Sequence, residues 1–395
     1  MARTGIKITT TDTVLGKPLD VNTTSMILTQ DIDTELGSNF VIKGRSLAEF
    51  IDKGLRDESV TAKCIGKYFS PSPTVSLDGN LLWVAGYDGT TDGILAAVRA
   101  TVVNSFDERP RQIMVIADER TDEGFGGVDA SSISTFTDAA SQLAKEGIRV
   151  VFLIATALDG GEDETTSNSI TNADDVTKWN SPFSAICPMK SSADSTIIDG
   201  VVYAGATLAT ISVGTSIGDG GLEAITTPSI LAIYRDDESD ASVDVKSLAL
   251  SNVEALGEKG YLFTRTRPPR NGLWWNDGAT CNTSANALSS LEAARTICSM
   301  ADDLQAFFVP YINTRVPVTS TGDIQSTYKQ VVLDNARAAV VQKYIESGDI
   351  SDARINLVAK DNDMIGTRTW EVTLSILPAP TLRWVDGYVF YVKNL

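Results

Sequence analysis

The stretch that decides the fold is YLFTRTRPPRNGLWWNDG, residues 261–278. Its first seven residues, YLFTRTR, are typical of a strand, and the proline pair at 268–269 interrupts it. The segment that follows is rich in arginine and tryptophan. It ends in NDG, where Asn and Asp tolerate a positive φ and Gly adopts it freely. We therefore predict a strand followed by a rigid turn.

A long amphipathic helix is predicted directly after this turn. Ser289 and Glu292 fit a capping box, in which each side chain accepts a backbone N–H at the start of a helix. Phe307, Phe308 and Pro310 mark the end of the helix. The apolar residues that recur at helical spacing are Leu288, Leu291, Ala294, Cys298, Ala301 and Leu304.

The arginines of this stretch have two interpretations. Arg265, Arg267 and Arg270 lie close in sequence to Trp274 and Trp275, a combination that can stack nucleic-acid bases. Phosphate binding needs a basic surface, however, and the chain has a formal net charge of −18. Arginine stacked on tryptophan is also a common packing arrangement. We therefore favour packing and expect no nucleic-acid partner.

The negative charge is concentrated in the middle of the chain. Residues 61–260 carry 13 basic and 29 acidic residues, a net charge of −16, whereas residues 261–395 carry 13 of each. We expect the acidic middle to face solvent and the neutral C-terminal part to contact other protein.

The absence of histidine excludes several chemistries. GTSIG, residues 214–218, matches the GxSxG nucleophile elbow, but that site needs a histidine base. We predict that it marks a helix end, because it closes an uncharged run over residues 200–218. That run is only marginally long enough to span a bilayer, so we expect a buried helix and no membrane insertion. Neither a signal peptide nor a paired cysteine motif is evident, which fits synthesis in a reducing cytoplasm.

Strands and helices alternate through residues 25–155, which predicts a largely parallel sheet covered by helices. The predicted strands are residues 25–29, 81–86, 112–117 and 149–155, and the predicted helices are residues 46–55, 92–105 and 131–145. Acidic loops are predicted at residues 118–127, after the strand at 112–117, at residues 159–164, after the strand at 149–155, and at residues 235–240. Asp118, Asp122 and Asp129 could hold Mg²⁺ or Ca²⁺, but a solvated acidic loop is the commoner case. We expect no metal and no cofactor.

The C-terminal part combines another long helix with two β-type runs. The helix is predicted over residues 324–347, and it ends at Gly348. Its predicted inward residues are Tyr328, Val331, Val332, Ala336, Val340, Val341 and Tyr344. Alternating patterns over residues 370–376 and 382–392 predict strands.

Strands at the ends of a chain leave edges that can pair with another chain. The residues predicted to contact neighbouring subunits are Ile6, Ile8, Trp384, Tyr388, Phe390 and Val392. The chain is therefore predicted to mix α/β and α+β structure, as an N-terminal arm at 1–22, an acidic α/β body at 23–255, and a C-terminal α+β domain at 256–395 with a strand arm.

The chain resembles the contractile tail sheath proteins of bacteriophages and phage-like contractile injection systems, in particular a divergent branch of them. The matching segments are TTTDTVLGKPL at 9–19, residues 261–278, SSLEAART at 289–296 with its continuation to Pro310, GDIS at 348–351, and the terminal strands. The resemblance spans nearly the whole chain, and its motifs include no catalytic signature.

The resemblance implies a structural subunit of a virion tail or phage-like particle. Its copies would stack as six-membered rings around a tail tube and contract to drive the tube through the target cell envelope. The implied partners are other copies, the tail tube protein, and the baseplate and tail terminator proteins. No nucleotide would be needed, in agreement with the lack of a Walker motif.

The tube-facing side is predicted to lie in the neutral C-terminal part, because an acidic surface would repel an acidic tube. The candidate residues are Arg295, Arg315, Lys329, Arg337 and Lys343. Solvated helix-face charges remain the alternative for each of them. Two other classes also remain open: an α/β enzyme, which only the sheet architecture favours, and a tube or baseplate component.

Overall fold

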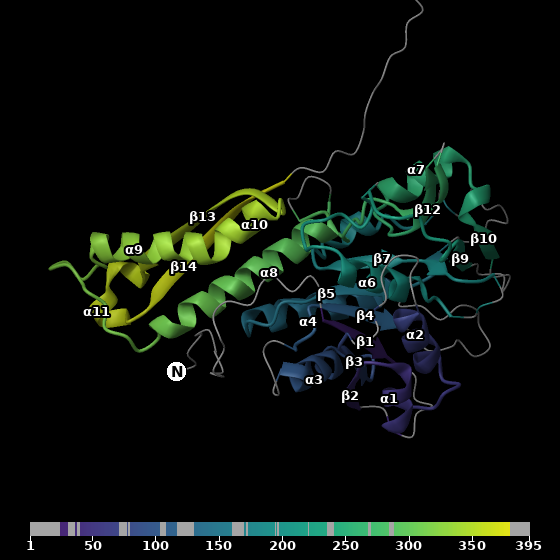
Figure 1. Cartoon of the computed structure of the whole chain (residues 1–395), viewed down its shortest axis with the longest axis horizontal. Helices are drawn as coiled ribbons and strands as arrows, with labels where there is room; N and C mark the ends of the chain where they lie inside the picture. The colour runs from purple at the N-terminus through teal and green to yellow at the C-terminus, as the bar shows by residue number, and fades with distance from the viewer. Residues whose placement is uncertain are drawn as a thin grey trace, which may run out of the picture.

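Figure 1 shows the computed structural model, in which a body is joined to a projecting lobe. We call the described residues up to the middle of helix α8 (Leu291–Phe308) the body, and the rest of α8 with residues 309–379 the lobe. The structure describes residues 24–30, 36–37, 40–70, 77, 80–102, 108–116, 130–159, 170, 173–193, 195, 197–219, 221–234, 241–267, 270–283 and 288–379.

A six-stranded sheet, in the order β2-β3-β1-β4-β5-β7, forms the centre of the body. Five neighbouring strands are parallel, and β2 pairs antiparallel with β3 at one edge. This confirms the predicted largely parallel sheet. Its strands are β1 (Ser25–Thr29), β2 (Val41–Gly44), β3 (Leu82–Gly86), β4 (Gln112–Ile116), β5 (Val151–Ala155) and β7 (Ser184–Cys187).

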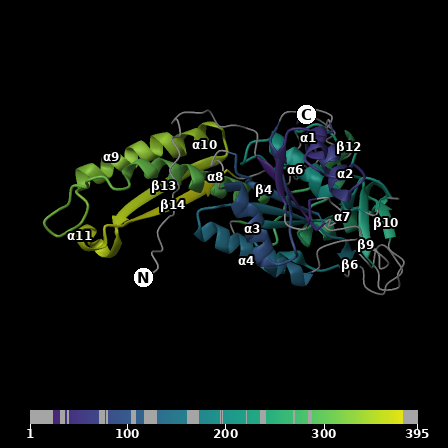
Figure 2. The same cartoon turned by 90° about the horizontal axis from the view of Figure 1, so that it is seen from below.

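Two helices cover each face of this sheet, α3 and α4 on one side and α2 and α6 on the other (Figure 2). The helices of this part are α1 (Leu47–Asp52), α2 (Val60–Phe69), α3 (Thr91–Val102), α4 (Ala130–Lys145), α6 (Gly200–Thr210) and α7 (Leu250–Glu258). Helix α2 was not predicted, although the Ser59 side chain caps it by accepting the Ala62 N–H. Its buried side carries Val60, Cys64, Ile65 and Tyr68 at helical spacing.

The uncharged run at residues 200–218 forms α6 and the turns that follow it. The helix is buried, as predicted, but it ends at Thr210, so the GTSIG sequence lies beyond it rather than at its last turn. No helix within the described ranges is both long and apolar enough to cross a membrane.

A smaller mixed sheet lies beside the main one. Strand β9 (Ile230–Tyr234) pairs with β6 (Leu158–Asp159), β8 (Met189–Lys190) and β10 (Ala241–Asp244). Short 3-10 helices occupy Val176–Trp179, Val245–Ser247, Val309–Tyr311 and Lys360–Asn362.

The arginine-tryptophan segment is a strand, not the predicted turn. Strand β11 (Thr264–Arg267) pairs antiparallel with β12 (Arg270–Trp275). The hairpin forms because Trp274 and Trp275 are buried in the body at 3% and 2% exposure. The Arg270 guanidinium lies over the Trp274 ring, 4.9 Å from its centre, which is the packing arrangement that the sequence favoured.

Helix α8 (Leu291–Phe308) runs from the body into the lobe (Figure 1). Its cap is Ser290 rather than the predicted Ser289. Ser290 has an extended backbone, and its hydroxyl accepts the Ala293 N–H. Glu292 is therefore the second residue of the helix, one position too early to complete a capping box.

The lobe packs a helical segment and a hairpin around the second half of α8. The segment consists of α9 (Ser326–Ala336), a π-helical turn (Arg337–Val341) and α10 (Gln342–Glu346). The π turn buries both Val340 and Val341, whereas Val331, predicted to face inward, is 54% exposed. The hairpin pairs β13 (Ile350–Ala359) with β14 (Trp370–Pro378), and α11 (Met364–Thr367) lies between them.

The clusters of buried side chains divide inside α8. Leu291, Ala294 and Cys298 belong to the core of the body, whereas Met300 and Leu304 belong to the smaller cores of the lobe. The sequence predicted a domain boundary after residue 255. The buried cores do not separate at that position, and the division into folding units stays a prediction. Helix α8 is thus shared between both parts.

Two helical glycines provide a matched test of how α6 packs on the sheet. A Cβ at Gly205 would lie 2.2 Å from Met114 Sδ and 2.7 Å from its Cγ. Gly205→Ala is expected to lower the free energy of unfolding by about 1–3 kcal/mol through overpacking. Gly257→Ala in α7 meets no atom within 4 Å. It should raise stability by about 0.5–1 kcal/mol, because alanine is the better helix former. Urea unfolding of both variants measures the difference, and equal effects would contradict the close packing of α6.

Candidate functional site at the junction of body and lobe

One buried carboxylate joins α8 to the starts of two central strands. The Asp302 side chain is 1% exposed, and it pairs with Arg109, which is equally buried and precedes β4. Arg149, directly before β5, donates from Nη1 to Asp302 Oδ1 at 3.2 Å. Arg111 Nε lies 3.9 Å from Asp302 Oδ2. We call these four residues the Asp302 cluster.

The electrostatics of the Asp302 cluster follow from its burial. Desolvation lowers the pKa of Arg109, and the nearby Asp302 carboxylate counteracts that effect. Arg109 also donates from Nη1 to the Gly147 carbonyl at 3.1 Å, and Arg149 donates to Gln305 Oε1 at 3.1 Å. The cluster therefore joins charge pairing to hydrogen bonds that fix the side-chain positions.

Arg295 makes a second buried connection between α8 and the body. It is 4% exposed, and its guanidinium donates to the carbonyls of Leu208, Ile211 and Ser212, where α6 ends. Burial lowers the pKa of Arg295 to about 10. A cation at this position satisfies carbonyls that have no partner within the helix and complements its dipole.

Arg295 was predicted as a tube-facing candidate, but its guanidinium is buried against these backbone carbonyls. The sequence held a signal against that prediction, because residue 295 lies four positions after Leu291 and three before Cys298, both of which belong to the buried face of α8. A charge on the apolar face of a helix indicates a buried partner, which here consists of backbone carbonyls.

Asp349 connects the start of β13 to the segment that follows α6. Its Oδ1 accepts hydrogen bonds from the Ser212 hydroxyl at 2.7 Å and from the Gly214 N–H at 3.0 Å. A Cβ at Gly214 would lie 2.5 Å from Asp349 Cα, so only glycine permits this approach. The close approach of Asp349 thus explains why residue 214, the first of the GTSIG sequence, is a glycine.

A polar contact inside the lobe continues from the Asp302 cluster. The Tyr344 hydroxyl lies 2.7 Å from Ser299 Oγ and 2.5 Å from Asp303 Oδ2. Arg111 also donates to Ser299 Oγ, at 3.1 Å. Burial raises the pKa of Tyr344, and the adjacent Asp303 charge raises it further. The phenol is therefore a permanent hydrogen-bond donor that ties α10 to α8.

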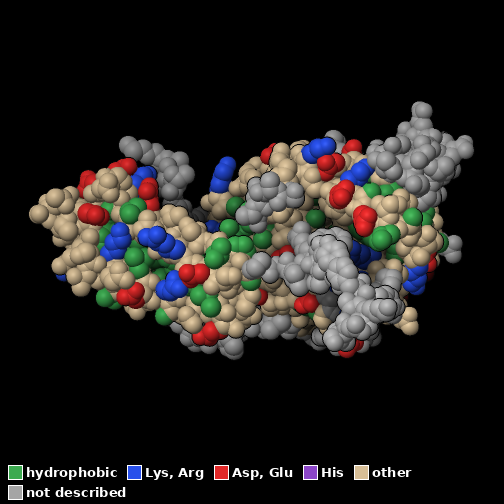
Figure 3. All heavy atoms as spheres, turned by 90° about the horizontal axis from the view of Figure 1, so that it is seen from above, with side chains coloured by type: hydrophobic (Ala, Val, Ile, Leu, Met, Phe, Trp, Pro, Cys, Tyr) green, Lys and Arg blue, Asp and Glu red, His purple; other side chains and the backbone are tan. Residues whose placement is uncertain are grey.

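The remaining tube-facing candidates differ in their surroundings. Lys343 pairs with Asp303 at 2.6 Å, and Arg337 pairs with Asp352 at 2.8 Å. Arg315 is exposed and Lys329 is half-buried, and neither forms an ion pair with another residue that the structure describes. On the face seen in Figure 3, acidic and basic side chains of the lobe alternate, without a patch of one sign.

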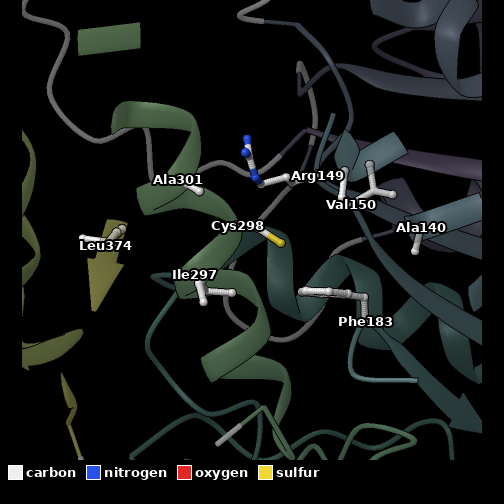
Figure 4. Close-up of a pocket in the computed structure, with 9 residues that line it drawn as sticks. Ala140, Arg149, Val150, Phe183, Ile297, Cys298, Ala301 and Leu374 are labelled. Carbon is white, nitrogen blue, oxygen red and sulfur yellow. The ribbon is translucent and has the colours of Figure 1, made fainter. Parts of the chain in front are cut away.

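Two cavities flank Ile297 between the body and the lobe. The first has a volume of about 260 Å³, and apolar side chains from α4, α8 and β14 line most of it, with Arg149 at its rim. Figure 4 shows the Arg149 guanidinium directed away from Phe183. The second, of about 230 Å³, lies between Gly214, Glu292, Asp349 and the end of β14. Polar contacts, rather than a continuous apolar core, thus fix the junction.

Other predicted site residues lie outside the described ranges. These are the arm residues Ile6, Ile8, Trp384, Tyr388, Phe390 and Val392, and the possible metal ligands Asp118, Asp122 and Asp129. Within the described ranges, no group of three or more Cys, Asp or Glu side chains is placed to hold a metal ion.

The buried and exposed ion pairs provide a second matched test. Asp302→Asn is expected to lower the free energy of unfolding by about 3–5 kcal/mol, because it leaves buried guanidinium charge without a counter-charge. Asp352→Asn removes the exposed partner of Arg337 and should lower stability far less, because solvent screens an exposed ion pair. Urea unfolding followed by tryptophan fluorescence measures both. A small effect of Asp302→Asn would show that the cluster does not hold α8.

Comparison with known proteins gives matches at the level of structure. No protein-family model and no curated protein matches the sequence. A chain from the 6-fold symmetrised baseplate of the anti-feeding prophage aligns over 99% of both chains, with a TM-score of 0.63 and 9% identity. A chain from that system's contracted helical sheath covers 100% of this chain and 99% of its own length, with a TM-score of 0.56 and 10% identity.

A chain from the contracted sheath complex of the extracellular contractile injection system PVC covers 98% of this chain and 99% of its own length. Its TM-score is 0.59 and its identity 11%. These alignments run through both the body and the lobe. The chain therefore has the fold of these sheath and baseplate chains of contractile injection systems.

Proposed function

We propose that this chain is the structural subunit of a contractile tail sheath. Copies would form six-membered rings that stack helically around a tail tube, and contraction of this sheath would drive the tube through the target cell envelope. The observation that carries the proposal is the structural alignment with chains from two contracted sheaths, which covers nearly the full length of this chain and of each of those chains. The protein would act in a virion tail or phage-like particle, without catalysis or a cofactor.

The lobe supports the proposal because its hairpin offers strand edges. Among the described residues, β13 and β14 pair only with each other. Trp370, Val372, Leu374 and Ile376 face the lobe core, whereas the alternate side chains of β14 are exposed. An open edge on a sheet with one buried face can accept further strands from another chain.

The arms would supply those strands. Residues 1–22 and 382–395 carry the apolar alternating positions Ile6 and Ile8 at one end, and Trp384, Tyr388, Phe390 and Val392 at the other. Strand addition would connect neighbouring subunits through backbone hydrogen bonds, each contributing about 0.5–1.5 kcal/mol net. A few such bonds per subunit would keep the lattice connected while the rings move.

The C-terminal domain, residues 256–395, would face the tube, and the acidic body, residues 23–255, would face at least partly outward. Arg315 and Lys329 are the strongest tube contacts in this proposal, because Arg337 and Lys343 already have carboxylate partners. Exposed ion pairs contribute about 0–1 kcal/mol each, so such contacts can break during contraction. Further partners would be the baseplate and tail terminator proteins.

A baseplate component is the second candidate. It is favoured by the alignment with a chain from the anti-feeding prophage baseplate, whose TM-score is 0.63. The two functions differ in extent of assembly. A sheath subunit forms tubes of many rings, whereas a baseplate component stops at a single ring or a small complex.

The first test is assembly of the purified protein, alone and with its tail tube protein, viewed by negative-stain electron microscopy. Hollow, helically ordered tubes or sheath fragments are expected. Deletion of residues 1–19, or of residues 382–395, should leave the circular dichroism of the body intact and abolish the tubes. A stable monomer under all conditions, or normal tubes from both truncated chains, would contradict the proposal.

The second test reverses charge on the lobe. Arg315→Glu combined with Lys329→Glu should reduce tube-dependent assembly, with a larger effect at low salt because salt screens exposed charges. The control is Lys63→Glu combined with Lys246→Glu, two exposed residues of the body that make the same change in net charge. Pelleting with purified tubes measures both variants. Loss of assembly only in the body variant would indicate that the body, rather than the C-terminal domain, faces the tube.

A further inference from the structure

Three arginines share a single carboxylate where β4 and β5 begin. Arg109 is buried against Asp302, whereas Arg111 Nε and Arg149 Nη1 lie 3.9 Å and 3.2 Å from different oxygens of the same carboxylate. Three positive charges thus face one negative charge, which leaves a surplus of two. Because both contacts are made to one carboxylate, the Arg111 and Arg149 side chains lie beside each other.

The described surroundings do not offset this surplus. The nearest acidic residue in sequence, Asp303, pairs with Lys343 at 2.6 Å. Burial lowers the pKa of Arg109, the Asp302 carboxylate counteracts that effect, and the two other arginines lower the pKa further. Repulsion between the three guanidinium groups is therefore only partly compensated.

Two of the arginines keep donors that another group can reach. The Arg111 and Arg149 side chains are 35% and 27% exposed. Arg111 donates from Nη1 to Ser299, and Arg149 donates from Nη1 to Asp302 and Gln305. The Nη2 group of neither arginine has a hydrogen-bond partner among the residues that the structure describes. Two guanidinium groups from different strands thus present unused N–H donors at one place.

This combination of charge and donors fits a phosphate group. Phosphate carries a charge of about −1.5 to −2 at neutral pH and offers several acceptor oxygens, which planar guanidinium groups bind with two parallel hydrogen bonds. Its charge matches the surplus, whereas a carboxylate would offset only half of it. The net charge of −18 does not prevent binding, since salt screens charges beyond about 8 Å under physiological conditions.

We propose that Arg111 and Arg149 form a binding site for a phosphate dianion at the junction of body and lobe. Each guanidinium donates from Nη2 to phosphate oxygens, and Asp302 and Arg109 hold the pair in place from the buried side. Because the Asp302 carboxylate belongs to α8, bound phosphate relieves repulsion at the point where α8 meets β4 and β5. The site lies within one chain and does not depend on assembly.

Phenylglyoxal, which modifies guanidinium groups that solvent can reach, tests the site in the unaltered full-length chain. At about pH 8 phosphate is a dianion. Phosphate should slow the modification of Arg111 and Arg149 about fivefold or more relative to chloride at equal ionic strength. Modification of Arg315, which is exposed on the lobe, should not change. Peptide mass spectrometry measures the rate at each arginine. Equal rates in phosphate and chloride at Arg111 and Arg149 would overturn the proposal.

Two variants test whether the arginines act together. In Arg111→Gln, about tenfold more phosphate should be needed to protect Arg149, because one of the two guanidinium groups is lost. Arg99→Gln is the matched control, since it removes a guanidinium that pairs with Glu146 on the surface of the body. It should leave the protection of Arg149 unchanged. Circular dichroism checks that both variants fold, and the unaltered chain keeps the test valid if Arg111→Gln does not.

Acetate at equal ionic strength distinguishes a dianion site from a carboxylate site. It should protect Arg111 and Arg149 only at about tenfold higher concentration, because it carries half the charge. Protection by acetate as strong as that by phosphate would overturn the proposal and indicate a protein carboxylate as the ligand. The assay uses unassembled protein, so its result is separate from that of the sheath proposal.

Discussion

The position of the lobe depends on the Asp302 carboxylate. It lies on the one helix that enters both cores, and it holds arginines that precede β4 and β5. A buried charge is tolerated only with paired and hydrogen-bonded partners, so the helix cannot slide or rotate here without leaving charge uncompensated. The Asp302 cluster thus sets the register between the sheet of the body and everything after α8, including Tyr344 and its contact with Asp303.

Two further polar contacts complete the fixation of α8 and the lobe. Arg295 binds the carbonyls at the end of α6, and Asp349 binds Ser212 and Gly214 just beyond that end. Between these points lie two cavities, the first of which is lined mostly by apolar side chains. Such a junction gives the lobe a defined orientation, because hydrogen bonds are directional.

The elements that the sequence predicted well have strong local signals. The strands at residues 25–29 and 112–116 are short apolar runs, α1 begins after the Ser46 cap, and α8 has a regular apolar stripe. Helix α2 and strand β13 were missed. Strand β13 places Ala353, Ile355 and Leu357 at alternate positions only in its second part, and its pairing with β14 makes its role clear. The arginines and the glycine of residues 270–275 indicate a turn, whereas the structure has a strand there whose tryptophans are buried in the body.

By itself, the sequence determined the fold class, the largely parallel sheet and the amphipathic α8, because apolar periodicity acts over a few residues. Only the tertiary structure decided which partners the charged side chains bind. Arg295 became a buried helix cap, Lys343 and Arg337 acquired carboxylate partners, and Asp302 became the joint between body and lobe. Their partners lie between 15 and almost 200 positions away in the chain, and the pairing depends on which elements the fold brings side by side.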